Sequence, residues 1–125
     1  MADDAWTGTD GAGQLGELSV VAAVNGGIRV VTVTGEIDHQ TAEPLRQALD
    51  MSTPPGPRVA VDMSGVSFMD STGINILIAA HQALAQAGGW LRLAAVTEPV
   101  QRTIQLVGLH TVIDSRETLE QALHN

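Results

Sequence analysis

The chain has 125 residues, with 6 basic and 14 acidic side chains, so its formal charge is −8. That length fits one domain, and the acidic balance argues against direct binding to nucleic acid or to an anionic membrane surface. Cysteine is absent, which excludes disulfides, a thiolate nucleophile and cysteine-based metal sites.

The first part of the chain differs in composition from the rest. Residues 1–16 are polar and acidic with little apolar periodicity, which predicts a flexible tail, and residues 17–125 are expected to form the folded domain. The beginning of the chain lacks the basic and apolar regions of a signal peptide. No apolar stretch approaches the roughly 20 residues that span a bilayer. We therefore expect a cytoplasmic protein.

An antiparallel hairpin is the first predicted unit. Residues 18–24 and 28–34 are rich in valine, and Asn25-Gly26-Gly27 between them is typical of a tight turn. After Gly35 the apolar period changes to that of a helix, which begins near Thr41. Residues 59–61 are then predicted to form a short strand of the buried kind.

The most apolar helix of the chain is expected to follow Asp70-Ser71-Thr72-Gly73 and to run to about Ala87. It carries two apolar stripes, the first made of Ile74, Leu77, Ile78, His81 and Leu84, the second of Ile76, Ala80, Ala83 and Ala87. A helix that is apolar on so much of its circumference is either deeply buried or presents a face to a partner.

The last third of the chain continues the alternation. Residues 90–96 are predicted to form a strand, a helix is expected to open near Pro99 and end at Gly108, and residues 111–113 are predicted to form the last strand. Asp114 and Glu117 have the spacing of a capping box before a final helix. The order β-β-α-β-α-β-α-β-α predicts an α/β domain: a mixed sheet with an N-terminal hairpin and about four helices.

The residue patterns argue against an enzyme. Neither Ser64 nor Ser71 lies in a G-x-S-x-G pattern, and the absence of lysine excludes a phosphate-binding P-loop. The four histidines occur singly, which favours surface or packing positions over a general base or a metal site; they are His39, His81, His110 and His124. We therefore predict no catalytic residue, cofactor or metal.

The segment 70–73 has two readings. Asp, Ser and Thr are preferred at helix starts because their side-chain oxygens accept hydrogen bonds from unpaired N–H groups, which explains the segment fully. A hydroxyl at a helix N-terminus is also a suitable phosphoacceptor, since a phosphoryl group there faces N–H donors and the positive end of the helix dipole. The residue types permit both readings.

Two stretches together resemble the STAS family, and within it the bacterial anti-sigma factor antagonists. They are residues 35–45 (GEIDHQTAEPL) and residues 59–62 (VAVD) leading into residues 67–73 (SFMDSTG). The resemblance covers roughly residues 17–123. It implies a binding module whose unphosphorylated form binds an anti-sigma factor that is also a serine kinase, so that a sigma factor is released. Phosphorylation by that kinase breaks the complex, and a PP2C-type phosphatase restores it.

The resemblance assigns roles residue by residue. Ser71 matches the phosphorylated serine, Thr72 is the adjacent alternative acceptor, and Asp70 and Gly73 complete the motif. Asp38 matches an acidic residue of the family's partner-facing loop, although loop or cap formation ahead of the next helix explains it as well.

Asn75 departs from the family pattern, because many members carry glycine there. Its polar side chain is expected near the partner surface, together with Asp38, Asp70, Thr72 and Gly73. The resemblance implies no direct contact with nucleic acid or membrane, and it reaches the sigma factor only indirectly. The alternative is a STAS scaffold or sensor subunit of another signalling complex without a sigma factor.

Overall fold

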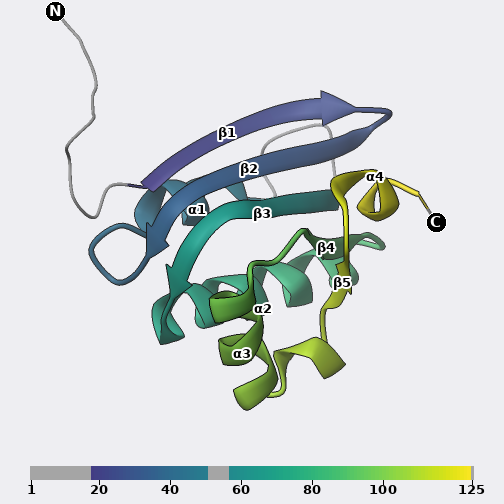
Figure 1. Cartoon of the computed structure of the whole chain (residues 1–125). Coiled ribbons are helices and arrows are strands. Elements are labelled where there is room, and N and C mark those ends of the chain that lie inside the picture. The colour runs from purple at the N-terminus through teal and green to yellow at the C-terminus, as the bar shows by residue number, and fades with distance from the viewer. Residues whose placement is uncertain (1–17, 51–56, 125) are drawn as a thin grey trace, which may run out of the picture.

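A computed structural model describes residues 18–50 and 57–124. They form one five-stranded sheet in the order β1-β2-β3-β4-β5, with four α-helices and one 3₁₀ helix (Figure 1). The expected tail, residues 1–16, lies outside the described residues. The elements are β1 Leu18–Asn25, β2 Ile28–Ile37, α1 Glu43–Ala48, β3 Arg58–Met69, α2 Ser71–Gln86, β4 Trp90–Ala94, α3 Glu98–Leu106, η1 Leu109–Thr111, β5 Asp114–Arg116 and α4 Leu119–Ala122.

The sheet is mixed, as the order of elements predicted. β1 pairs with β2 in antiparallel fashion, and β2, β3, β4 and β5 are parallel to one another. Gly26 and Gly27 have φ values of 60° and 81°, the positive values that a tight hairpin turn requires. The predicted hairpin and the α/β class are therefore confirmed.

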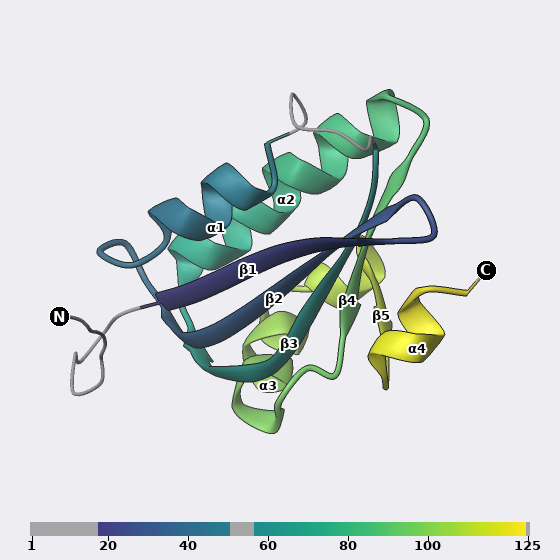
Figure 2. The same cartoon turned by 90° about the horizontal axis from the view of Figure 1, so that it is seen from above.

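Helices cover both faces of the sheet. Leu45 of α1, Leu77 of α2 and Ile104 of α3 pack with the valines of β2 and β3 in the main core. A smaller cluster on the other face joins Ile28, Ala60 and Ala94 to Ala122 of α4. Figure 2 shows α1 and α2 side by side on one side of the sheet and α4 on the opposite side. Among the described residues, no helix combines the length and apolar character needed to cross a bilayer.

Strand β3 is much longer than the predicted residues 59–61. It runs from Arg58 to Met69 because β2 continues to pair with it past the polar residues Asp62, Ser64 and Gly65. The register shifts between Thr32 and Thr34, so an extra β3 residue is accommodated as an irregularity. Polar residues in mid-strand conceal its length from a pattern based on hydrophobicity.

The end of the chain also corrects two predictions. The predicted strand at residues 111–113 is wrong: η1 covers Leu109–Thr111, and β5 is the polar segment Asp114–Arg116. The capping box of Asp114 and Glu117 is wrong as well. Thr118 is the N-cap of α4, and its Oγ1 accepts a hydrogen bond of 3.1 Å from the backbone N–H of Gln121.

Arginines that extend from the strands bind the C-terminal carbonyl groups of two helices. Arg29 of β2 is buried and donates to the carbonyls of Ala48 and Asp50 at the end of α1, at 3.0 and 2.9 Å. Arg92 of β4 donates to the carbonyls of Ala122 and His124 at the end of α4, at 3.1 and 2.7 Å. A cation at a helix C-terminus interacts favourably with its partial negative charge.

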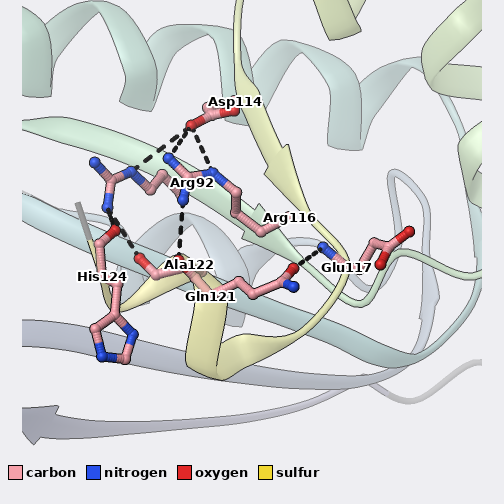
Figure 3. A network of polar contacts seen from close by, with 7 residues as sticks. All are labelled: Arg92, Asp114, Arg116, Glu117, Gln121, Ala122 and His124. Atoms are coloured by element: carbon pink, nitrogen blue, oxygen red, sulfur yellow. Dashed lines mark hydrogen bonds and ion pairs between the residues drawn. The ribbon is translucent and has the colours of Figure 1, made fainter.

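Asp114 bridges Arg92 and Arg116, an arginine of β5 that also binds a carbonyl group of α4 (Figure 3). Its carboxylate lies 2.7 Å from Arg116 Nη2 and 3.9 Å from Arg92 Nε. The hydrogen bond from Arg116 lowers the pKa of Asp114, and the charges of both arginines add to that effect against a smaller contribution from burial. Arg92 also stacks on Trp90, 3.8 Å from the ring centroid.

Candidate functional site

The parallel strands β2 and β3 end together, and this brings two predicted site segments to one place. Ile37 is in register with Met69, the last residues of the two strands. The backbone N–H of Asp70 donates to the carbonyl of Ile37 at 3.1 Å. Asp38 and Asp70 therefore follow directly on paired strand ends. The carboxyl ends of parallel strands are where α/β sheets commonly place their ligands.

Asp70 is the N-cap of α2, as one reading of the motif predicted. Its backbone is extended, at φ −103° and ψ −167°, and its Oδ1 accepts a hydrogen bond of 2.8 Å from the N–H of Thr72. Ser71 is the first residue of the helix and is exposed, whereas Thr72 is half-buried. The Ser71 hydroxyl is therefore the more accessible of the two candidate acceptors.

Gly73 has a packing role. A Cβ atom added at this position would lie 2.5 Å from Cγ of Met69 and 2.8 Å from Cγ2 of Ile37. Real Cβ atoms essentially never approach other atoms so closely, so a side chain here would push α2 away from the ends of β2 and β3. Glycine lets the helix begin directly against both strands, which fixes where Ser71 lies.

Asp38 shapes its own loop. Its Oδ1 accepts hydrogen bonds from the backbone N–H groups of Gln40 and Thr41, at 2.9 and 3.1 Å. Thr41 Oγ1 donates to the carbonyl of Glu36 at 2.6 Å and accepts from the N–H of Asp38 at 2.9 Å. The loop between β2 and α1 is thus closed by its own side chains, which bears out the loop-forming explanation of Asp38.

A groove between α1 and α2, which the sequence did not reveal, opens beside this site. It measures about 930 Å³, and its wall on α2 includes the small apolar side chains of Ala79, Ala80 and Ala83. Thr72 and Asn75 lie at one end, near His39 of the β2–α1 loop. The second apolar stripe predicted for α2 supplies three of its residues, Ile76, Ala80 and Ala83. This stripe was the signal available in the sequence, because a helix that is apolar on so much of its circumference was expected either to be buried or to face a partner.

Besides the groove, Phe68 is a candidate site residue that the sequence patterns did not indicate. It lies on β3 opposite Glu36, and 47% of its side chain is exposed. Only Met69 and Asp70 separate it from the exposed Ser71 along the chain. Aromatic residues, phenylalanine among them, are enriched in protein–protein interfaces relative to the rest of the surface. Phe68 is the only phenylalanine of the chain, which was the signal available in the sequence.

The electrostatic surroundings of the site are mixed. Arg46 and Glu43 form an ion pair on α1 beside the groove. The hydrogen bond from Arg46 lowers the pKa of Glu43, and this outweighs a smaller desolvation effect. Among the described residues, no hydrogen bond joins a histidine to Ser71. His39 is exposed, and His81 on α2 is half-buried.

Known proteins that are similar in sequence and in structure share this fold. The STAS domain family matches residues 19–122. The anti-sigma-F factor antagonist RsfB of Mycobacterium tuberculosis is 32% identical over 109 residues, which cover 85% of this chain and 87% of that protein. The crystal structure of an anti-sigma factor antagonist from Mycobacterium paratuberculosis superposes with a TM-score of 0.76 at 33% identity, covering 85% of this chain and 91% of that one.

A more distant structure shares the fold alone. SpoIIAA, a cell fate determinant of Bacillus, has a TM-score of 0.65 in its phosphorylated form at 21% identity, with 84% of this chain and 96% of that one covered. A STAS match over nearly the whole described chain, together with relatives above 30% identity, is decisive. The chain belongs to the STAS-domain family of anti-sigma factor antagonists.

Proposed function

We propose that this chain is a phosphorylation-controlled binding module rather than an enzyme. In its unphosphorylated form it binds an anti-sigma factor that is also a serine kinase, in the cytoplasm, and so frees a sigma factor. The carrying observation is that Ser71 is exposed at the start of α2, at the paired ends of β2 and β3 and near the α1–α2 groove. Residues 17–125 act as the folded unit, and residues 1–16 are an appended tail.

The proposed contact surface surrounds Ser71. Asp38 and Asp70 contribute carboxylates at the strand ends, and Thr72 and Asn75 contribute polar side chains at the mouth of the groove. Gly73 contributes by letting α2 approach the sheet closely. Phe68 adds an exposed apolar anchor.

Phosphorylation of Ser71 would act as a local charge switch. It adds about −1.5 to −2 charges beside Asp70 and within the surface that the partner covers. Two like unit charges about 4 Å apart near a protein surface repel by about 4 kcal/mol. That corresponds to a roughly thousandfold loss of affinity. The complex therefore dissociates without any change in the fold.

Substitution of Ser71 tests this proposal. Ser71→Ala should bind the cognate anti-sigma factor like the unchanged chain and take up no phosphate from kinase and ATP. Ser71→Asp should bind it more weakly, and a PP2C-type phosphatase should restore binding of the phosphorylated chain. Ser67→Ala is the matched control, because it removes a different exposed hydroxyl, which lies on β3, and this variant should still be phosphorylated at Ser71.

Mass spectrometry of the intact chain and isothermal titration with the anti-sigma factor are the measurements. Stoichiometric phosphorylation of Ser71→Ala would contradict the assignment and point to Thr72. Purification of the chain with a signalling complex that contains no sigma-factor regulator would instead support the scaffold or sensor alternative.

A further inference from the structure

Among the residues that the structure describes, no strand pairs along the outer edge of β1. β1 is the outermost strand in the order of the described strands, and Figure 1 shows it along the upper margin. Proteins usually protect such an edge with charged residues, proline or a bulge. β1 has the sequence LSVVAAVN, without a charge or a proline, and all eight of its residues pair with β2 in unbroken register. Its outer edge is thus a regular template for another strand.

Two valines of β1 are unusually exposed, one on each face of the sheet. Val24 shares a face with Leu18 and Val20, which pack against the main core, yet 63% of Val24 is exposed. Val21 pairs with Thr32 on the other face and is 60% exposed. They are two of the six large hydrophobic side chains that the described residues expose.

We propose that two copies of this chain associate through antiparallel pairing of their β1 strands. A twofold axis perpendicular to the sheet keeps each side chain on its own face, so only residues of the same face can lie opposite one another. This excludes registers shifted by one residue. The inference is independent of the proposed switch at Ser71, since it uses only the outer edge of β1 and no group of the candidate site.

The register that best covers the exposed valines has its axis at Val21. It sets Val21 opposite Val21 of the second copy, Val20 opposite Ala22, and Val24 opposite Leu18. Both exposed valines then gain an apolar neighbour, and the main-chain groups of the two edges pair. A register centred on Ala22 would put alanine on the axis and leave Leu18 without a partner. Self-complementarity of this kind is what a twofold interface requires.

A charge placed on the axis tests the association. In Val21→Lys, two ammonium groups face each other directly, so dimerisation should weaken by about tenfold or more. Val112→Lys is the matched control, because Val112 is 52% exposed and lies outside β1. A mixture of Val21→Lys and Val21→Glu chains should recover dimer, since opposite charges then meet. Sedimentation equilibrium of the full chain measures each case, and circular dichroism verifies folding.

Cross-linking tests the register, because the chain has no cysteine of its own. Oxidised Val21→Cys should form a disulfide dimer at least several-fold faster than Ala22→Cys or Val112→Cys. Faster cross-linking of Ala22→Cys overturns the register. A full chain that stays monomeric at high concentration, with all three variants cross-linking equally slowly, overturns the proposal. So does a monomer whose β1 edge is covered by its own residues 1–17, which would show as slow amide exchange in β1.

Discussion

At the scale of single residues, the structural roles of the segment 70–73 are compatible with the proposed phosphorylation of Ser71. Asp70 caps α2 and Gly73 allows the helix to begin against the strand ends. These structural roles do not compete with modification of Ser71, because they hold the hydroxyl at an exposed and fixed position. The cap is part of what exposes the proposed acceptor.

Substitution of Asp70 separates the cap from the charge. Asp70→Ala should lower the free energy of unfolding by about 1 kcal/mol, because the N–H of Thr72 loses its acceptor. Asp70→Asn keeps a side-chain oxygen and should stay close to the unchanged chain. Urea denaturation measures both variants. Equal losses in the two would show that the carboxylate charge, and not the cap, stabilises this end of α2.

At the scale of elements, strands supply hydrogen-bond donors for the carbonyl groups at the C-terminal ends of the short helices. α1 and α4 are too short to be stable by themselves. Arg29 and Arg92 bind the carbonyls at their C-terminal ends, and Asp114 links Arg92 to Arg116 beneath α4. The spacing of residues in the helices does not reveal these contacts, because each arginine lies on a strand distant in sequence.

Loss of Arg92 should therefore loosen α4. Arg92→Ala removes two hydrogen bonds to carbonyl groups and the stacking on Trp90. We expect a loss of about 1–2 kcal/mol and faster amide exchange in α4 than in α2. Arg102→Ala removes an exposed ion pair with Glu98 on α3, so it should change stability by less than about 0.5 kcal/mol. Equal effects of both variants would refute the role of Arg92.

At the scale of the whole molecule, the charge of −8 matters less than where charges lie. A phosphoryl group changes the total modestly, yet at Ser71 it falls within the proposed partner surface. The β1 edge carries no charged residue, so two acidic copies can approach each other there without placing like charges in contact. Screening of the general repulsion by salt should favour that approach.

The two carboxylates with lowered pKa values predict a loss of stability in acid. The pKa values of Asp114 and Glu43 lie below their ordinary values of 3.8 and 4.5. Their contribution is thus complete above those ordinary values and is lost as the pH falls through the lower pKa of the folded state. The free energy of unfolding, measured from pH 7 downward, should begin to fall below about pH 4.5.

Asp114→Asn should make that acid decline less steep, whereas the equal charge change in Glu120→Gln should leave it unaltered. Hydrogen bonds from Arg116 to the Asp114 carboxylate are the reason for the difference. Identical pH profiles for Asp114→Asn and the unchanged chain would contradict this account of the network.

The sequence by itself determined the features that depend on near neighbours. The hairpin turn at residues 25–27, the Asp70 cap, the long apolar α2 and the order of elements all follow from turn chemistry and periodicity over a few residues. The Ser71 motif is local in the same way, so the candidate acceptor could be identified from the sequence.

Only the tertiary structure decided the rest. β3 extends past Asp62 and Ser64 because β2 pairs with it again from Gly65 onward, and the polar segment Asp114–Arg116 becomes β5 because β4 lies beside it. The meeting of the Asp38 loop with Ser71, the groove between α1 and α2, and the exposure of Phe68 likewise depend on which elements become neighbours. Pairing between distant segments is a property of the assembled sheet, and no local pattern of residues encodes it.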